Sequence, residues 1–543
     1  MDILLHDPSV LVKNGPLVVG VVIGLYVLYS IFGFLQRFRT PLRRLRGPPA
    51  HSLIFGNTKR LVEDDSVEEQ WLQEYGATYA TRVIFGNWRL NTIDPRAVAH
   101  ILSHTEIYPK PEPTKAMLRS AIGEGLVVAE GETHKRQRRI MNPSFSPGQI
   151  REVTPIFYDV SYELRDALNR AVDDVSDQQI DIYSWIGRAS LDIIGIAGFD
   201  YRFNALEDDS NELFSAFHSL VESLGAAPVQ GLLRNRFKWF GMIPTKANKT
   251  MLTSRDTVKR IGMQLIEEKK AAVMQELESK SGEKKIIGRD LLSALIRANL
   301  AADLTPAHQM SDEEVLAQIT TFLAAGHETS AAGITWTIFS LSQHLDVQNR
   351  LRAELQQVSD ETPLMDDLNA LPYLDQVVKE SLRIHSPIHW TVRTALHDDT
   401  IPLSKPVIDR YGQPLHRVRV QAGDFVGVEI MAMNRSKELW GDDAKEFKPE
   451  RWEKDLQGAS EIPGIYAHTL TFIGGPRACI GYRFSVIETK ALLFVLLREF
   501  EFLPVQGKEI QTKSVIVVRP IVKGEEEKGV QLPMIVRRLP KAG

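Results

Sequence analysis

The chain has almost no cysteine: Cys479 is the only one in 543 residues. A single thiol excludes a disulfide framework, a zinc ribbon and an iron–sulfur cluster held by one chain, because each needs several cysteines. An excess of basic residues is also missing, since the formal net charge is −4, and this argues against a nucleic-acid-binding protein. No internal repeat or low-complexity linker divides the body. We therefore expect one large globular domain that faces a reducing compartment.

Apolar runs long enough to cross a membrane are missing except at the N-terminus, where residues 17–35 carry no charge. As a helix this stretch would span roughly 28 Å, close to the hydrocarbon thickness of a bilayer. The alternatives are a cleaved signal peptide and a buried core helix. The stretch ends in Phe34-Leu35-Gln36-Arg37, which offers no small-residue cleavage site, and it is apolar on all sides. We expect a single transmembrane helix at residues 17–35, preceded by a lumenal N-terminus at residues 1–16.

The charges that flank this span predict its orientation. Lys13 alone precedes it, and five arginines follow: Arg37, Arg39, Arg43, Arg44 and Arg46. This asymmetry predicts a cytoplasmic body. Residues 36–49 would form a basic and proline-rich hinge, and residues 50–543 the body itself. The glycosylation sequons at Asn248 and Asn434 would then be silent, because such sites are used on the lumenal side.

Helical patterns dominate the body from about residue 130 to residue 385. Short strand-like segments lie before them, at residues 79–85 and 89–93, and strand-rich composition returns at residues 403–428 and 515–536. This distribution predicts a fold that is mainly α with small β-sheets.

The setting of Cys479 points to a metal ligand rather than to an inert core thiol. Residues 472–481 read FIGGPRACIG, and the two glycines and the proline are incompatible with a regular helix or a central strand. Arg477 places a positive charge near the sulfur, and a helical pattern follows from Phe484, so we expect the thiolate to be favoured. A lone thiolate in such a loop can be the axial ligand of a haem iron.

One long helix carries a second chemical motif. Ser311 and Glu314 form a capping box at its start, and no proline interrupts the pattern before Pro363. In its middle lie residues 324–330, AAGHETS, whose small residues would let a flat ligand approach the backbone. The pattern also resembles the start of a zinc protease motif, but Ala331 occupies the position of the second histidine. Close helix packing beside an exposed acid is the structural alternative.

A third motif is the pair Glu380 and Arg383, spaced by three residues. Such a pair is usually a solvated salt bridge of small energy. Here Pro372 and Pro387 bracket the helix, and apolar residues occupy its other faces. We therefore expect this pair to be buried and to need further partners.

Together these motifs resemble the cytochrome P450 family of haem-thiolate monooxygenases over about residues 47–538. The family's ligand loop, Phe-x-x-Gly-x-Arg-x-Cys-x-Gly, matches at Phe472, Gly475, Arg477, Cys479 and Gly481. The resemblance implies the cytochrome P450 fold, the transmembrane helix preceding it, with haem b as the cofactor and Cys479 as the axial ligand of its iron.

The resemblance also implies roles for the other motifs. Thr329 would hold dioxygen and its water over the distal face of the haem, and Glu328 would help to relay protons. Glu380 and Arg383 would join Arg451 in a structural network near the ligand loop. Trp452 stands where the family more commonly has phenylalanine.

The two haem propionates call for cationic or hydrogen-bonding residues from separate segments. The candidates are Arg477, Arg393, Arg138 and His134. Many relatives carry tryptophan in place of His134, although histidine can also donate to a carboxylate. Part of the basic run at residues 134–139 is expected to be a solvated face, which could instead dock an acidic reductase.

The resemblance implies a membrane-bound monooxygenase that inserts one oxygen atom from O2 into a lipophilic small molecule. Electrons would come from NADPH through a separate cytochrome P450 reductase, because the chain has no dinucleotide or flavin fingerprint. The resemblance implies pocket walls at residues 119–126, residues 214–239, the helix around Phe322, residues 388–390 and residues 516–518. These walls are largely apolar, and the likeness to fungal microsomal members favours a terpenoid or another secondary metabolite. The expected location is the endoplasmic reticulum membrane, with a single pass.

Two alternatives keep the haem but change the activity. One is a haem-thiolate isomerase or dehydratase that needs no reductase, and the other is a haem-binding protein without turnover. The adjacent Glu328 and Thr329 argue against both, because neither alternative needs a distal proton relay.

Overall fold

The computed structural model describes residues 24, 39–64, 67–172, 179–208, 210–225, 246–278, 288–301, 308–514 and 516–540. The α-helices in this part of the chain are α2 (Thr58–Glu63), α3 (Val67–Tyr75), α4 (Pro95–Ser103), α5 (Glu112–Ile122), α6 (Gly131–Met141), α7 (Pro147–Ala171), α8 (Ile182–Phe199), α9 (Glu212–Gly225), α11 (Lys246–Glu278), α12 (Leu291–Asn299), α13 (Asp312–Phe322), α14 (Glu328–Gln343), α15 (Leu345–Gln356), α16 (Met365–Asn369), α17 (Pro372–Ile384), α18 (Ile430–Asn434), α19 (Lys437–Trp440) and α20 (Tyr482–Glu499). Short helical turns lie between them at η2 (Pro41–Arg44), η3 (Ile84–Gly86), η4 (Asn142–Phe145), η7 (Leu323–His327), η8 (Pro449–Glu453), η9 (Ala459–Glu461), η10 (Gly475–Arg477) and η11 (Glu526–Lys528).

The strands form small separate sheets. Their bounds are β1 (Thr78–Arg82), β2 (Trp88–Thr92), β3 (Gln179–Asp181), β4 (Trp390–Thr394), β5 (Asp399–Ile408), β6 (Pro414–Val420), β7 (Phe425–Glu429), β8 (Phe500–Pro504), β9 (Ile510–Ser514), β10 (Val518–Val522) and β11 (Pro533–Arg538). One sheet has the order β1-β2-β7-β4, in which β2 and β7 are parallel and the other pairs are antiparallel. The remaining sheets are β3-β11-β8, β10-β9 and the hairpin β5-β6. The prediction of a mainly helical fold with small sheets is confirmed.

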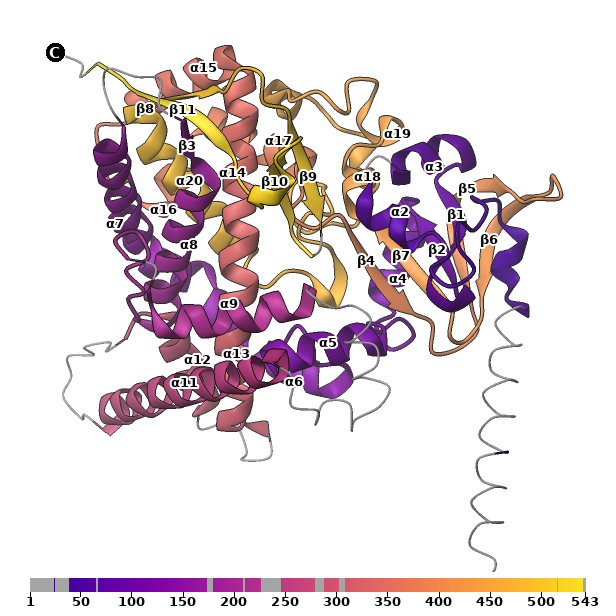
Figure 1. Ribbon diagram of the computed structural model, residues 1–543, viewed down its shortest axis with the longest axis horizontal. Coiled ribbons are helices and arrows are strands. Elements are labelled where there is room, and N and C mark those ends of the chain that lie inside the picture. The colour runs from indigo at the N-terminus through magenta and orange to yellow at the C-terminus, as the bar shows by residue number, and fades with distance from the viewer. Residues whose placement is uncertain are drawn as a thin grey trace, which may run out of the picture.

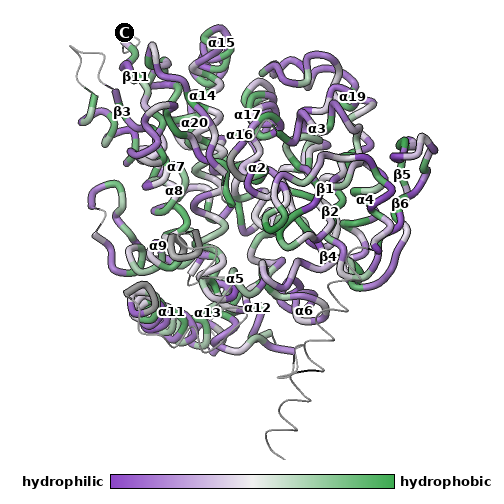
Figure 2. The backbone as a smooth tube through the Cα atoms, turned by 45° about the vertical axis from the view of Figure 1, so that its right-hand side comes forward, coloured by the Kyte–Doolittle hydropathy of each residue, from purple (hydrophilic) through white to green (hydrophobic). Residues whose placement is uncertain are grey.

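The long helices gather on one side of the molecule, and the β1-β2-β7-β4 sheet and the β5-β6 hairpin lie on the other, together with short helices such as α2 and α3 (Figure 1). Each side has its own hydrophobic core. The larger core joins α7, α8, α14, α17 and α20, and the smaller one lies under the four-stranded sheet. Hydrophobic stretches, green in Figure 2, run through the interior, whereas hydrophilic ones such as much of α15 lie toward the outside.

The long helix predicted from the capping box is observed, with one irregular turn. The Ser311 hydroxyl accepts from the Glu314 backbone N–H, and the Glu314 carboxylate accepts from the Ser311 N–H in return. After α13 the chain makes the π-helical turn η7 and continues as α14 without a break. Turns of this kind interrupt the regular hydrogen-bond ladder and are frequent at functional sites.

The segment that leads into the body is packed against it. Leu42 and Leu45 are almost fully buried in the smaller core, and Arg44 pairs with Asp409 at 2.9 Å. This segment belongs to the hinge expected at residues 36–49. The end of that hinge is therefore attached to the β5-β6 hairpin.

Among the described residues, no helix is both long and apolar enough to cross a lipid bilayer. The transmembrane helix expected at residues 17–35 lies outside the described residues apart from Gly24, and so does the lumenal segment at residues 1–16. The sequon residue Asn434 is fully buried and donates to the Thr471 hydroxyl at 2.9 Å, so its amide is inaccessible in the folded chain. The Asn248 side chain lies outside the described part of the structure.

Candidate functional site: a cysteine facing a cavity

The loop that carries Cys479 is shaped by two glycines. Gly475 has a φ of +70°, and a Cβ there would lie 2.6 Å from the Leu102 carbonyl oxygen. A Cβ on Gly474 would lie 1.7 Å from the Pro463 carbonyl oxygen. Larger residues are therefore excluded at both positions. The Cys479 N–H donates to the Phe472 carbonyl at 3.0 Å and closes the loop just before α20.

The Cys479 side chain is exposed, but only toward a cavity that protein surrounds. Burial raises the pKa of its thiol, and the Gly481 N–H and the charge of Arg138 only partly oppose this effect. Burial therefore works against the thiolate that Arg477 was expected to favour. Arg477 is paired with Glu130 and donates to the Ala129 carbonyl at 2.6 Å, and the cation that lowers the pKa of the Cys479 thiol is Arg138. A metal that binds this sulfur would itself remove the proton.

The π-helical turn and the start of α14 form the wall above the sulfur. Ala325, Gly326 and Thr329 all line the cavity. The Thr329 hydroxyl donates to the Ala325 carbonyl at 2.5 Å, as expected for a hydroxyl beside an irregular turn. A Cβ on Gly326 would lie 3.0 Å from the Ile194 side chain, so the glycine also permits close packing of the turn against α8.

Glu328 does not line this cavity. Its carboxylate pairs with Arg519 on β10, and about a quarter of each side chain remains exposed. The two residues expected to act together are thus neighbours in sequence with different surroundings. Thr329 faces the cavity, whereas Glu328 lies at its outer side with access to solvent.

Buried cations line another part of the cavity. Arg393 on β4 donates to the Thr391 hydroxyl and to the Val392 carbonyl, and no carboxylate among the described residues pairs with it. Burial lowers the pKa of Arg393 to about 10. Lys110 faces the same space, 3.9 Å from Glu130, and burial followed by repulsion from Arg393 and Arg477 holds its pKa well below the usual value. Cations crowded in this way mark a site for an anionic ligand.

His134 and Arg138, both on α6, line the cavity beside these cations. Burial, together with the charges of Lys110 and Arg138, lowers the pKa of His134 to about 4, so its imidazole is neutral at neutral pH. Arg138 donates to the Ala478 carbonyl, next to the cysteine. The structure thus brings together all four candidates for propionate binding, and it adds Lys110, which the sequence reasoning missed.

The remaining wall of the cavity is apolar. Its lining includes Leu126, Val127, Phe322 and Phe472. Five segments were expected to wall the pocket, and two of them contribute, through Leu126 and Phe322. Residues 388–390 and 516–518 and the described part of the segment at residues 214–239 do not line it. The rest of that last segment, residues 226–239, lies outside the described residues.

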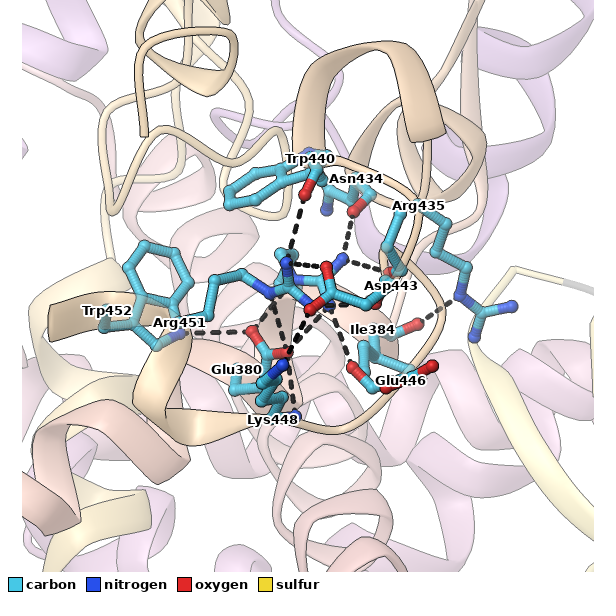
Figure 3. Close-up of polar contacts among 12 residues, drawn as sticks. Glu380, Ile384, Asn434, Arg435, Trp440, Asp443, Glu446, Lys448, Arg451 and Trp452 are labelled. Carbon is cyan, nitrogen blue, oxygen red and sulfur yellow. Dashed lines mark hydrogen bonds and ion pairs between the residues drawn. The ribbon is translucent and has the colours of Figure 1, made fainter. Parts of the chain in front are cut away.

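The expected structural network is present in the described residues and is fully buried at its centre. Arg383 binds Glu380 through two parallel hydrogen bonds of 2.8 and 2.9 Å, and both side chains are 0% exposed. Arg451 donates to the same Glu380 carboxylate at 3.2 Å (Figure 3). Arg451 also pairs with Asp443 at 2.6 Å, a partner that the sequence did not reveal.

Backbone groups complete this network. Arg383 donates to the carbonyl oxygens of Asn434 and Ala444, at 2.8 and 2.5 Å, so it connects α17 to two later segments. The Trp452 indole N–H donates to Glu380 at 3.1 Å (Figure 3). Phenylalanine, the commoner residue of the family here, has no such donor, so the exchange adds a hydrogen bond as well as a change in packing.

A single sulfur donor facing a cavity that is apolar on one side and cationic on another is the arrangement of a haem-thiolate site. The comparisons with known proteins agree. The family model described as "Cytochrome P450" matches residues 46–525, and the chain belongs to the cytochrome P450 family.

Similar proteins are known from fungi. Cytochrome P450 monooxygenase 128 from Postia placenta is 46% identical over 514 residues, which cover 93% of this chain and 94% of the relative. Cytochrome P450 monooxygenase 205 from the same organism is 43% identical, over 94% of this chain and 95% of the relative. Cytochrome P450 monooxygenase claW from Ampulloclitocybe clavipes is 36% identical, over 96% and 98%. The chain is accordingly a monooxygenase of the haem-thiolate class.

The family implies a haem cofactor, and the residues of the cavity fit one. Cys479 offers the sulfur ligand and the apolar wall fits the porphyrin. The buried Arg393 pairs with no carboxylate among the described residues, and beside it lies Lys110, whose nearest carboxylate, Glu130, is 3.9 Å away and also pairs with Arg477. Sequence reasoning missed Lys110, although it lies between Pro109 and Pro111, which fix an extended backbone.

Replacing Arg383 with lysine tests the buried network. Lysine cannot reproduce the two parallel hydrogen bonds and leaves Glu380 incompletely paired, so we expect a loss of about 3–5 kcal/mol in the free energy of unfolding. Denaturant unfolding of the holoprotein measures this change. Arg151→Ala is the control, because the Arg151–Asp366 pair is exposed and should contribute about 1 kcal/mol at most. Equal effects of the two variants would contradict the buried network.

Replacing Arg393 with alanine tests the anion site. Removing a buried cation from a charged hydrogen bond should cost about 1.5–3 kcal/mol, or roughly a 10- to 150-fold faster loss of haem. Transfer of haem to an excess of apomyoglobin measures this rate. Arg139→Ala, an exposed arginine on α6, should leave the rate unchanged. An unchanged rate in Arg393→Ala would remove this residue from the site.

Proposed function

We propose that this chain is a membrane-anchored monooxygenase that inserts one atom of O2 into a lipophilic small molecule, using haem b. One observation carries the proposal: the Cys479 sulfur and the Thr329 hydroxyl line the same cavity, whose remaining walls are apolar or cationic. An isomerase or dehydratase would have no use for a hydroxyl above the sulfur. The wall at Thr329 therefore favours the monooxygenase over both alternatives.

Different parts of the cavity wall would bind the iron and the propionates of the haem. Cys479 would bind the iron and donate electron density to it, while Lys110, Arg393, Arg477 and Arg138 would hold the propionates. When bound, haem supplies the iron at which dioxygen is activated. The chain itself must orient the substrate, limit water and deliver protons.

In this proposal Thr329 and Glu328 take part in different steps of proton delivery. The Thr329 hydroxyl now donates to Ala325 and can rotate toward a water in the cavity. Glu328 is partly exposed and paired with Arg519, so it can exchange protons with solvent and then turn inward. In this proposal the carboxylate takes protons from outside, and the hydroxyl fixes the last water in the chain.

The substrate is proposed from the cavity wall. Leu126, Val127, Ile194 and Phe322 offer hydrophobic contacts and no fixed charge opposite the cationic side. A lipophilic molecule fits this wall, and terpenoids and other secondary metabolites are the classes that fungal membership of the family favours.

Electrons are proposed to come from NADPH through a cytochrome P450 reductase. Residues such as Lys135 and Arg139 on α6 are exposed beside the cysteine loop and could contact an acidic partner. The uncharged stretch at residues 17–35 and the arginines that follow it support a single-pass anchor in the endoplasmic reticulum membrane, with the body in the cytoplasm.

Replacing Thr329 with alanine tests the proposed reaction. We expect the thiolate signature of the reduced, carbon monoxide-bound protein to remain, while product formed per NADPH falls about 10-fold or more and peroxide rises, because the last water loses its anchor. Product and peroxide are measured with full-length protein, reductase and a panel of lipophilic candidates.

Two matched variants complete this experiment. Thr329→Ser keeps a hydroxyl and should retain most of the coupling, and Cys479→Ser should lose the thiolate signature. Undiminished coupling in Thr329→Ala would contradict the role of the hydroxyl. A thiolate signature in Cys479→Ser would contradict the whole assignment.

A further inference from the structure

A buried carboxyl group lies behind the wall of the cavity, outside every motif discussed so far. Glu488 on α20 is 0% exposed, and its Oε1 lies 2.7 Å from the Ser190 hydroxyl on α8. The same Ser190 hydroxyl lies 3.3 Å from the carbonyl oxygen of His327, the last residue of the π-helical turn. Glu488 therefore reaches the oxygen-binding turn through one serine.

A second hydroxyl pair lies beside the first. The Ser330 hydroxyl lies 3.2 Å from the Ser485 hydroxyl, and both residues line the cavity. Ser330 follows Thr329 directly. Its hydroxyl lowers the pKa of Glu488 by hydrogen bonding, less than the hydroxyl of Ser190 does. The carboxyl group thus adjoins the turn at His327 and the start of α14 at Ser330.

No cation compensates this carboxyl group. Burial raises the pKa of Glu488 to about 8, and the hydroxyls of Ser190 and Ser330 only partly oppose the rise. A glutamic acid in these surroundings is neutral at neutral pH. Its second oxygen, Oε2, has no hydrogen-bond partner among the described residues, which an ionised carboxylate would tolerate poorly.

The charged and titratable groups of the packed elements are engaged elsewhere. On α8, Arg188 stacks on Trp185 and Asp192 accepts from the backbone N–H groups of Ala205 and Leu206. Glu328 pairs with Arg519, and Lys490 pairs with Asp375.

Two further titratable groups, His327 at the turn and Arg483 on α20, also have other neighbours. The His327 ring packs against Phe214, and burial lowers its pKa, so it is neutral. On α20, Arg483 lies over the Tyr482 ring. These groups leave the hydroxyls as the hydrogen-bonding partners of Glu488.

The protonation state of Glu488 decides which way the Ser190 hydroxyl donates its single proton. A serine hydroxyl has one proton to donate and can accept from another group. If Glu488 is ionised, Ser190 must donate to it and has no proton left for His327. If Glu488 is neutral, it can donate to Ser190, and Ser190 can then donate to the His327 carbonyl.

We infer that Glu488 is a positioning residue for the π-helical turn: as a neutral acid it donates to Ser190, and Ser190 in turn holds the His327 carbonyl. The turn carries Ala325 and Gly326, and its geometry sets where the Thr329 hydroxyl points. When Glu488 is ionised, the Ser190 hydroxyl donates to the carboxylate instead of to the His327 carbonyl, and the turn loses this hydrogen bond. The catalytic consequence rests on the proposed monooxygenase function, whereas the hydrogen-bond chain does not.

Glu488→Gln is the direct test, because glutamine keeps the shape, can donate to Ser190 and never ionises. Infrared spectra of the two full-length proteins should differ by the carbonyl stretch of a protonated carboxyl group, present in the parent below about pH 8 and lost above it. Absence of this band from the parent would overturn the proposal.

Unfolding gives a second readout that needs no turnover. Because the folded pKa is raised from 4.5 to about 8, the native parent holds one more proton than the unfolded chain between these values. The unfolding equilibrium constant of the parent should therefore rise, relative to that of Glu488→Gln, by up to about tenfold per pH unit across this range. Parallel curves for the two proteins would overturn the proposal. Glu132→Gln, an exposed site, is the control and should follow the parent.

The functional readout separates this role from simple packing. Product formed per NADPH should fall in the parent as pH rises through about 8 and stay level in Glu488→Gln. If Glu488→Gln folds poorly, Ser190→Ala takes its place: the infrared band should remain, shifted by the loss of its acceptor, and the dependence of coupling on pH should disappear. A band that does not shift in Ser190→Ala would contradict the chain of hydrogen bonds. If no turnover occurs in any variant, the infrared and unfolding results still decide the proposal, and only the proposed function fails.

Discussion

Buried positive charge beside an apolar cavity is the constraint on which the rest of the site depends. Arg393 is buried, repels Lys110 and pairs with no carboxylate in the part of the chain that the structure describes, while Lys110 shares its one carboxylate neighbour, Glu130, with Arg477. Burying an unmatched cation is costly, so these residues favour the state in which an anionic ligand is bound. Haem brings two carboxylates and an iron, and its binding should therefore stabilise the fold as well as complete the site.

A second buried charge cluster joins α17 to η8 and to the backbone at Asn434 and Ala444, and it differs from the first because its charges are paired. The Glu380 carboxylate accepts hydrogen bonds from Arg383, Arg451 and Trp452. The other N–H groups of Arg383 donate to backbone carbonyls. Such a network resists displacement, because breaking any one contact leaves a charge buried without a partner. The chain thus combines a cluster of paired charges that holds the structure together with a cluster of cations that can bind an anionic ligand.

Local signals in the sequence predicted the local features of this structure. The capping box at Ser311 starts α13, Pro372 begins α17, and the glycines before Cys479 shape its loop. Each of these features depends on neighbouring residues, and so it is visible in a short window. The propionate candidates were found by resemblance, and the structure brings them to one cavity.

What the sequence did not reveal depends on partners far along the chain. Arg477 is paired with Glu130, and Glu328 with Arg519, and neither partner is visible in the motif that carries its residue. The effect of burial on the Cys479 pKa likewise requires the closed cavity around it. Glu488 looks like an ordinary helical residue in the sequence, because its partner Ser190 lies nearly three hundred positions away along the chain.

The charges and the apolar wall of the cavity together fit a flat iron porphyrin that carries two carboxylates. The most direct measurement compares the binding of hemin and of its dimethyl ester, which lacks both charges, to the full-length haem-free protein. Because each charged hydrogen bond contributes about 1.5–3 kcal/mol, the ester should bind at least about 100-fold more weakly. Equal affinities would contradict the account, since the buried cations would then have no part in holding the cofactor.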